Sequence, residues 1–291
     1  MLSPLKKALA LAALPFSLQA QAYEIEPLGE GLYRFIDDRH RSVFMITDQG
    51  ALVTDPMNHA AATWLNNEIK QRFDTPVRYV VYSHNHSDHI YGGEVFDTPE
   101  TTFIAHRLAA QDIANTRAKA VSPDLVFDDE MTLRLGGKEV QLRYHGPNDG
   151  RGSISMYFKD HATMFVVDWI VIGRMPWQKL WSYDIQGMIN STREVLEYDF
   201  DTFVGGHAEV GDHADVERYL TYLESLYSQV TDGILAGKSL EQIQQEVDLS
   251  EYSDLAQYEE WVGLNIEGVH ERLMEESGMG WRSDLKGEHT H

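Results

Sequence analysis

Four side chains of the types that bind metal ions lie within one short segment of this sequence, Ser83-His84-Asn85-His86-Ser87-Asp88-His89. In an extended chain, His84 and His86 point the same way, because side chains alternate with a period of two. They can therefore hold one ion together, while Asp88 and His89 face a second one. Histidine and carboxylate donors without cysteine suit a borderline divalent metal such as zinc. The segment predicts a metal site, and incidental histidines in a polar loop are the weaker alternative.

Composition narrows the chemistry and the partners of this site. The 291 residues include 46 acidic and 24 basic side chains, a formal net charge of −22, and no cysteine. Disulfides, thiol nucleophiles and thiolate metal sites are therefore excluded. The negative charge disfavours nucleic acid, because phosphate binding needs a basic face, and it disfavours an anionic membrane surface. We expect a small-molecule substrate, neutral or cationic, and the sequence leaves the oligomeric state open.

The first 22 residues have the layout of a secretory signal peptide. A positive pair, Lys6-Lys7, precedes the apolar run 8–18, and Ala20-Gln21-Ala22 supplies a small-x-small cleavage site. The apolar run is too short to span a bilayer, and no later stretch approaches the ~20 apolar residues that a membrane helix needs. We predict cleavage after Ala22, a periplasmic or secreted protein with no stable membrane anchor, and a single domain over 23–291.

The metal segment directly follows a β-rich run, so strands must position it. Short β-rich runs alternate with helical segments through the first half of the chain, and further strands and a helix follow. Strands are predicted at 43–47, 51–54, 77–82, 102–105, 133–144 as a hairpin, 153–158, 163–167 and 203–204, and helices at 60–73 and 184–197. From Val216 to Leu273, apolar residues recur at intervals of three and four, the period of amphipathic helices. We expect C-terminal helices over 213–280 to pack on the same body.

The H-x-H-x-D-H pattern from His84 to His89 resembles that of the metallo-β-lactamase superfamily. Asp55, at the end of a strand, corresponds to a buried aspartate that orients the metal loop behind the ligands. Asp168 follows the strand 163–167, where the family has a carboxylate able to bridge two metals, and His207 in Gly205-Gly206-His207 matches its late histidine ligand. The resemblance extends from about residue 30 to 215. It implies an α/β fold, a four-layer αβ/βα sandwich, here with extra C-terminal helices.

One ligand position departs from the family pattern. The third ligand of the first metal is usually a histidine in a run like G-P-x-H-T, and this chain has Gly146-Pro147-Asn148-Asp149-Gly150. The ungapped spacing favours Asp149 as the ligand, with His145 as the alternative if the loop is remodelled. A third carboxylate beside Asp88 and Asp168 would loosen zinc or favour iron or manganese, which tolerate oxygen donors better.

The predicted metal ligands together suit hydrolysis at a pair of metal ions. The metal ligands are His84, His86, Asp88, His89, Asp149, Asp168 and His207, with Asp55 behind them. Two zinc ions, or iron or manganese, would lower the pKa of a shared water and yield a hydroxide that attacks a carbonyl. Asp88 is the predicted catalytic residue, which orients that nucleophile and accepts its proton. Esters, lactones, thioesters and β-lactam amides are the candidate substrates. An iron-dependent oxidoreductase and a non-catalytic accessory or binding protein on the same fold are the alternatives.

Two further groups of residues are interpreted more plainly. The segment Trp169, Met175, Pro176, Trp177 and Trp181 follows Asp168, and it would shape an apolar substrate pocket, with a packed core as the alternative for Trp181. His106 is expected to make a structural hydrogen bond. The remaining histidines lie outside the matched positions and are interpreted as surface or core polar groups: His40, His59, His161, His213, His270, His289 and His291.

Overall fold

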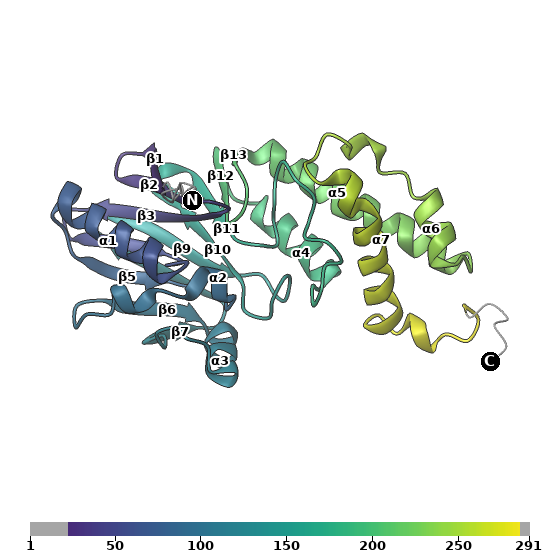
Figure 1. The fold of residues 1–291 in the computed structure, drawn as a ribbon, viewed down its shortest axis with the longest axis horizontal. Coiled ribbons are helices and arrows are strands. Elements are labelled where there is room, and N and C mark those ends of the chain that lie inside the picture. Colours follow the sequence, from purple (N-terminus) through teal and green to yellow (C-terminus); the bar gives the residue numbers. More distant parts are fainter. Residues whose placement is uncertain (1–22, 286–291) are drawn as a thin grey trace, which may run out of the picture.

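A computed structural model describes residues 23–285 of the chain, and Figure 1 shows two sheets with helices on their outer sides. The predicted signal peptide, residues 1–22, lies outside the described residues. The first sheet has seven strands in chain order: β1 (Tyr23–Gly29), β2 (Leu32–Asp37), β3 (His40–Thr47), β4 (Gly50–Thr54), β5 (Val77–Val81), β6 (Thr102–His106) and β7 (Leu125–Phe127). Strands β1 to β4 are antiparallel, and β4 to β7 are parallel.

The second sheet has six strands in the order β13-β12-β11-β10-β9-β8. Its strands are β8 (Glu130–Leu135), β9 (Lys138–Tyr144), β10 (Ile154–Phe158), β11 (Thr163–Val166), β12 (Thr202–Gly205) and β13 (Val210–Gly211). Strands β8 to β11 are antiparallel, whereas β12 runs parallel to β11. The predicted hairpin turns at Gly136 and Gly137, whose φ angles of 54° and 76° suit glycine in a two-residue turn.

The period of two along each strand divides the apolar side chains between separate cores. Val43 and Met45 of β3 point to the second sheet, while Phe44 points to the helices outside the first sheet. On the first sheet lie α1 (His59–Phe73) and α3 (Arg107–Thr116), and on the second lie α4 (Ile185–Val195) and α5 (His213–Leu235). The predicted four-layer αβ/βα sandwich is confirmed.

The chain from His213 onward is helical, as predicted. Helix α5 is followed by α6 (Leu240–Glu246) and α7 (Tyr258–Glu275), and Ser239 and Gln242 form a capping box at the start of α6. Figure 1 shows these helices continuing the molecule beyond the second sheet. Short 3-10 turns occur at Gly93–Val95, Lys159–His161, Ser250–Tyr252 and Met279–Trp281. Across residues 23–285, none of the helices combines the length and the apolar character needed to cross a membrane.

Helix α7 packs closely against the long segment 167–184, which connects β11 to α4. The amide of Asn265 donates hydrogen bonds to the backbone oxygens of Pro176 and Gln178, at 3.2 and 2.6 Å. Tyr222 of α5 donates to the side-chain oxygen of Asn265 at 2.6 Å, so two helices hold this segment in place. The C-terminal helices therefore position residues that follow Asp168.

Candidate metal centre

Parallel strands of both sheets end near one another, and these ends carry the predicted ligands. Asp55 follows β4, and the segment 83–89 follows β5, with the short helix α2 (Ser87–Ile90) within it. Asp168 follows β11, His207 follows β12, and Asp149 lies in the loop between β9 and β10. Side chains beyond the carboxyl ends of parallel strands meet in a common crevice. The topology thus brings together residues that are far apart in the sequence.

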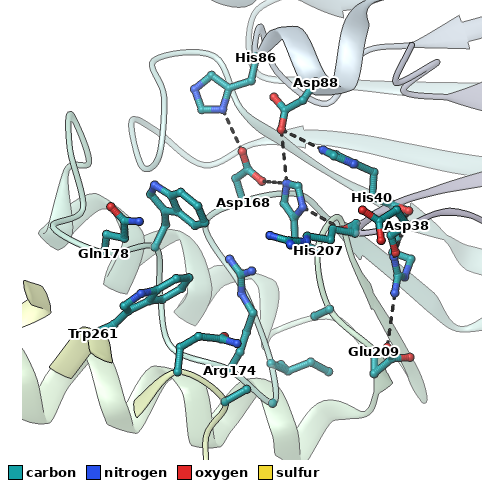
Figure 2. Close-up of a pocket in the computed structure, with 18 of the residues that line it drawn as sticks. Asp38, His40, His86, Asp88, Asp168, Arg174, Gln178, His207, Glu209 and Trp261 are labelled. Carbon is teal, nitrogen blue, oxygen red and sulfur yellow. Dashed lines mark hydrogen bonds and ion pairs between the residues drawn. The ribbon is translucent and has the colours of Figure 1, made fainter. Parts of the chain in front are cut away.

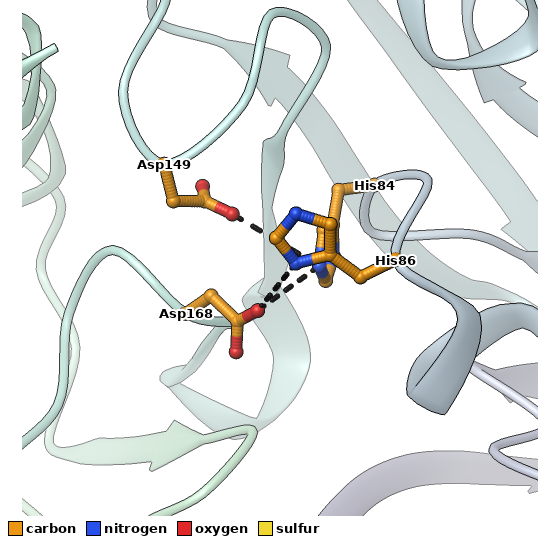
Figure 3. Close-up of side chains that lie close together, drawn as sticks. All are labelled: His84, His86, Asp149 and Asp168. Carbon is orange, nitrogen blue, oxygen red and sulfur yellow. Dashed lines mark hydrogen bonds and ion pairs between the residues drawn. The ribbon is translucent and has the colours of Figure 1, made fainter. Parts of the chain in front are cut away.

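The first group of donors combines two histidines of the metal segment with two aspartates (Figure 3). His84 Nε2 lies 3.1 Å from Asp168 Oδ2, and His86 Nδ1 lies 2.9 Å from the same oxygen. Asp149 Oδ2 lies 3.9 Å from His84 Nε2. One donor atom from each of the four residues lies within 4.8 Å of all the others. This spacing allows the four side chains to share one cation.

The second group uses the other oxygen of Asp168. The Nε2 atoms of His89 and His207 are 2.9 Å apart, and Asp168 Oδ1 lies 3.5 Å from the first and 3.1 Å from the second. Asp88 Oδ2 lies 3.7 Å from each of these two nitrogens. Asp168 therefore directs one oxygen toward each group, which is the arrangement of a bridging carboxylate.

His40 lies in this second group, although the sequence placed it outside the site. Its Nε2 is 3.3 Å from Asp88 Oδ2, and its ring centroid is 4.9 Å from that of His207. His40 is the first residue of β3, so the pairing of the sheet brings it there. No local motif marks it, and its position before a strand was the only available signal.

Hydrogen bonds behind the first group fix the orientation of His84. The backbone N–H and the hydroxyl of Ser83 donate to the two oxygens of Asp55, at 2.8 and 2.6 Å. The Ser83 oxygen also lies 2.8 Å from His84 Nδ1. Because the single hydroxyl proton of Ser83 goes to Asp55, it is the Nδ1–H of His84 that donates to Ser83. Nε2 of His84 then carries a lone pair and faces the Asp168 carboxylate, an arrangement that a cation between them stabilises.

Burial and neighbouring charges shift the acid–base behaviour of these residues. Burial lowers the pKa of His84 to about 3, which keeps its ring neutral, and burial raises the pKa of Asp55 to about 6. Burial alone would lower the pKa of His89, but the charge of Asp168 and its hydrogen bond, together with Asp55 and Asp88, raise it to about 9. In the metal-free protein His89 therefore holds a proton, which a bound metal would displace.

The environment of Asp149 indicates whether this site fits a metal. The residue is only 2% exposed, and neither of its carboxylate oxygens has a hydrogen-bond partner among the described residues. Burial, followed by the charge of Asp168, raises the pKa of its carboxyl group. An unpaired buried carboxylate is costly unless a cation compensates it. The orphaned oxygens and the mixed imidazole and carboxylate donors therefore fit divalent cations.

His145, the alternative third ligand, makes other contacts. Its Nδ1 lies 2.9 Å from Glu194 Oε2 of α4, and its Nε2 lies 2.7 Å from Ser155 Oγ of β10. Both ring nitrogens are thus engaged away from the metal group. The adjacent loop turns Asp149 inward instead. The side-chain oxygen of Asn148 accepts a hydrogen bond from the backbone N–H of Asp149, and the backbone oxygen of Asn148 accepts one from the N–H of Asp184, both at 2.8 Å.

These contacts predict opposite effects for two substitutions. We expect Asp149→Asn to reduce the metal content by about one ion per chain, because it removes a charged donor from the first group. We expect His145→Asn to leave the metal content unchanged and to destabilise the fold by about 1–3 kcal/mol, because it leaves the buried hydroxyl of Ser155 unsatisfied. Elemental analysis after dialysis and denaturant unfolding measure the two effects. Loss of metal from the His145 variant alone would show that the assignment is reversed.

The raised pKa of Asp149 also predicts a pH effect in metal-free protein. The stabilising contribution of such a carboxyl group is complete below its unfolded pKa near 4, and it is lost as the pH rises through the higher folded value. At pH 8, metal-free Asp149→Asn should therefore melt several degrees above the metal-free parent, and the gap should close at pH 4. With zinc added, the parent should be the more stable protein. A gap that is the same at both pH values would contradict this explanation.

The metal ligands open onto a cleft of 1180 Å³. His86, Asp88, Asp168 and His207 lie along one side of it. Figure 2 shows Trp261 and Gln178 on the opposite side, with Arg174 between them and the metal ligands. The cleft therefore places a site for a small molecule directly beside the predicted ions.

The aromatic segment after Asp168 divides between the cleft and the core. Trp177 and Trp181 line the cleft and are 42% and 53% exposed, so the packed-core alternative is wrong for Trp181. Trp169 and Met175 are buried in the core beneath the second sheet. His106, at the end of β6, lies 2.6 Å from the backbone oxygen of Asp128, the structural contact expected of it.

The fold and this set of donors define a metallo-β-lactamase-type protein, and comparison with known families agrees. Residues 36–221 match the model of the Metallo-beta-lactamase superfamily, which is more than half of the chain, so the chain belongs to this superfamily.

Individual relatives are distant. The chain is 23% identical over 240 residues to the 2,4-dinitroanisole O-demethylase subunit alpha of Nocardioides sp. (strain JS1661), covering 80% of this chain and 69% of that protein. It is similar in structure to a metallo-beta-lactamase from Pontibacter korlensis, with a TM-score of 0.63 and 17% identity over 70% of this chain and 99% of the other. A metallo beta lactamase from Hirschia baltica gives a TM-score of 0.61 and 13% identity over 68% and 96% of the two chains. The structural similarities bear on the fold alone.

Proposed function

We propose that the protein is a metal-dependent hydrolase with two ions at its active site, zinc being the first candidate. The observation that carries this proposal is Asp168, whose two oxygens face two separate groups of histidine and carboxylate donors. His84, His86 and Asp149 would hold one ion, and His89, His207 and Asp88 the other. Divalent ions at these positions supply a water of lowered pKa and polarise the bond under attack.

Residues of the second group would also act on the attacking water in such a reaction. Asp88 has a 48% exposed side chain that reaches the cleft, so it can accept a hydrogen bond from an attacking water and then its proton. His40 and His207 hold this carboxylate in place from within the group, at 3.3 and 3.7 Å. Asp55, through Ser83, keeps His84 in the tautomer that a metal requires.

The substrate class is proposed more broadly. Esters, lactones, thioesters and β-lactam amides all present a carbonyl to this kind of site. The relative from Nocardioides is named for O-demethylation of 2,4-dinitroanisole, an aromatic ether. We therefore add aryl ethers and aryl esters to the candidates. The tryptophan side chains along the cleft support an aromatic substrate. Export to the periplasm or medium, from the signal pattern of residues 1–22, is part of the same proposal.

Removing and restoring the metal tests the hydrolase proposal. The mature protein is treated exhaustively with a chelator and assayed on a panel of β-lactam, lactone, thioester, aryl ester and aryl ether substrates. We expect turnover to disappear and to return with added zinc or manganese, because the cations supply the reactive water. Hydrolysis that survives complete metal removal would contradict the proposal.

An iron-dependent oxidoreductase is the second candidate, and one observation favours it. Asp149 stands where a histidine is usual, so the first group offers two imidazoles and two carboxylates and accommodates iron better than a histidine-rich site. Elemental analysis of protein purified without added metal separates the two functions. Zinc would support hydrolysis, whereas stoichiometric iron with oxygen consumption would support the oxidative reaction.

A further inference from the structure

Arg174 has an unusual environment on the wall of the cleft (Figure 2). The residue lies in the segment between β11 and α4, and the carbon of its guanidinium lies 6.0 Å from the ring centroid of Trp177 and 5.6 Å from that of Trp261. Trp261 belongs to α7, so a C-terminal helix completes the contact. Two indole faces therefore fix the position of this cation.

The guanidinium forms no ion pair with an acidic side chain of the described residues. Within residues 23–285, no carboxylate oxygen lies within 4.0 Å of it, and its Nε is buried without a hydrogen bond. Arg41, another cation of the same cleft, differs because it contacts Glu209 at 3.4 Å. Arg174 is partly buried. Losing water without gaining an anion is unfavourable for a guanidinium. An anion entering the cleft would supply the missing partner.

The position of Arg174 relative to the metal ligands indicates how such an anion would be used. Figure 2 shows its guanidinium directed toward the side of the cleft that carries Asp168 and His207. Arg174 and Asp168 are close enough for the carboxylate charge to offset part of the effect of burial, which lowers the pKa of the guanidinium. A molecule held by Arg174 would thus lie beside the metal centre.

The side chains around Arg174 also indicate what the rest of the bound anion would be. The exposed indole surfaces of Trp177 and Trp181 face the same cleft, and planar aromatic rings stack favourably on such surfaces. Net charge is a poor guide here. A charge of −22 predicts a neutral or cationic substrate, but exposed charges beyond about 8 Å are largely screened at physiological salt, and Arg174 acts at contact distance.

We infer that Arg174 is a substrate-binding residue that selects aromatic molecules carrying an anionic group, such as a carboxylate, with the ring on the tryptophan surfaces. This inference rests on the proposed function, because it names the substrate class of the same site. It concerns binding, however, and needs no turnover.

The test compares 2-naphthoate with its neutral counterpart 2-naphthamide. Tryptophan fluorescence of the mature protein is titrated with each probe, with zinc and after metal removal. We expect naphthoate to bind about tenfold or more tightly than naphthamide in both states, since a charge-assisted pair adds to the stacking. The metal-free titration is decisive, because a carboxylate can also bind zinc directly. A preference that vanishes with the metal would overturn the inference.

Variants identify the residue responsible. Arg174→Gln should abolish the preference for naphthoate while leaving naphthamide binding unchanged, and Arg174→Lys should retain part of it. Arg134→Gln, which removes one charge from an exposed arginine outside the cleft, is the control and should bind both probes as the parent does. Equal weakening of both probes in a folded Arg174→Gln would overturn the inference. If that variant does not fold, the Lys variant decides: an undiminished preference for naphthoate overturns the inference, and a reduced one supports it.

The outcomes keep the two proposals apart. Naphthoate selectivity that depends on Arg174, in a protein without metal-dependent turnover, would support the binding site and contradict the hydrolase. Metal-dependent turnover of neutral substrates, with no naphthoate selectivity, would do the reverse.

Discussion

Asp168→Asn is expected to deplete both metal positions, lowering the metal content from about two ions per chain to well below one. The aspartate gives one oxygen to each group, and asparagine retains a single neutral oxygen and replaces the other with an amide donor. The backbone should not be disturbed, because the φ of 68° at this position is one that asparagine tolerates. Loss of several kcal/mol of transition-state stabilisation corresponds to a fall in turnover of about a thousandfold.

The control for this substitution is Asp199→Asn. Asp199 is exposed and lies outside both groups of donors, so its replacement makes the same change in charge and size. Elemental analysis and turnover with excess zinc are measured for both variants, alongside circular dichroism. An Asp168→Asn protein that retained two ions would show that this carboxylate does not bridge them, and the two-ion model would fail.

Gly268→Ala is expected to disrupt the cleft while leaving the metal centre in place. A Cβ at this position of α7 would lie 1.9 Å from the backbone oxygen of Lys179 and 2.6 Å from its carbonyl carbon. The close atoms belong to the backbone, so either the helix or the segment 167–184 would have to move at a cost in free energy. The hydrogen bonds from Asn265 to that segment would be strained. We expect a loss of about 1–3 kcal/mol in the free energy of unfolding. Substrate affinity should fall because Arg174 and Trp177 lie on the displaced segment.

Gly263→Ala, in the same helix, is the matched control. The nearest atom to its Cβ would be Nε2 of Gln244 at 3.8 Å, so the methyl group has room. Alanine is the better helix former by about 1 kcal/mol, and this variant should be slightly more stable than the parent. Denaturant midpoints, metal content and KM are compared for the two variants. If Gly268→Ala matched Gly263→Ala in all three, α7 would not hold the cleft wall.

Much of the fold could be predicted because its elements follow local rules. The strands at 43–47 and 77–82 are runs of β-branched and apolar residues, and the helix at 60–73 begins after a turn and repeats its apolar residues at helical spacing. Strands β1, β2, β7 and β13 were not predicted. Strand β1 has glutamates among its apolar residues and lies at a sheet edge, and β13 has two residues, so neither carries a strong pattern.

Some residues of the candidate site could likewise be predicted from the sequence, and others could not. The segment His84–His89 carries its ligands within six residues, so its chemistry is apparent from spacing. Asp168 and His207 were predicted through the family resemblance, and parallel strand ends explain why they meet the segment. His40 escaped prediction because only the pairing of β3 within the sheet brings it beside Asp88.

The sequence by itself determined the kind of chemistry available: imidazole and carboxylate donors without cysteine, placed after strands, in a chain of alternating strand and helix patterns. These are properties of neighbouring residues, which composition and periodicity record. Only the tertiary structure shows that Asp149 lies with His84, His86 and Asp168. It also shows that His145 contacts Glu194 and Ser155, which belong to different elements. It also decided that Arg174 lies beside the rings of Trp177 and Trp261, with no ion-pair partner among residues 23–285. Long-range packing places such side chains together, and no local pattern encodes it.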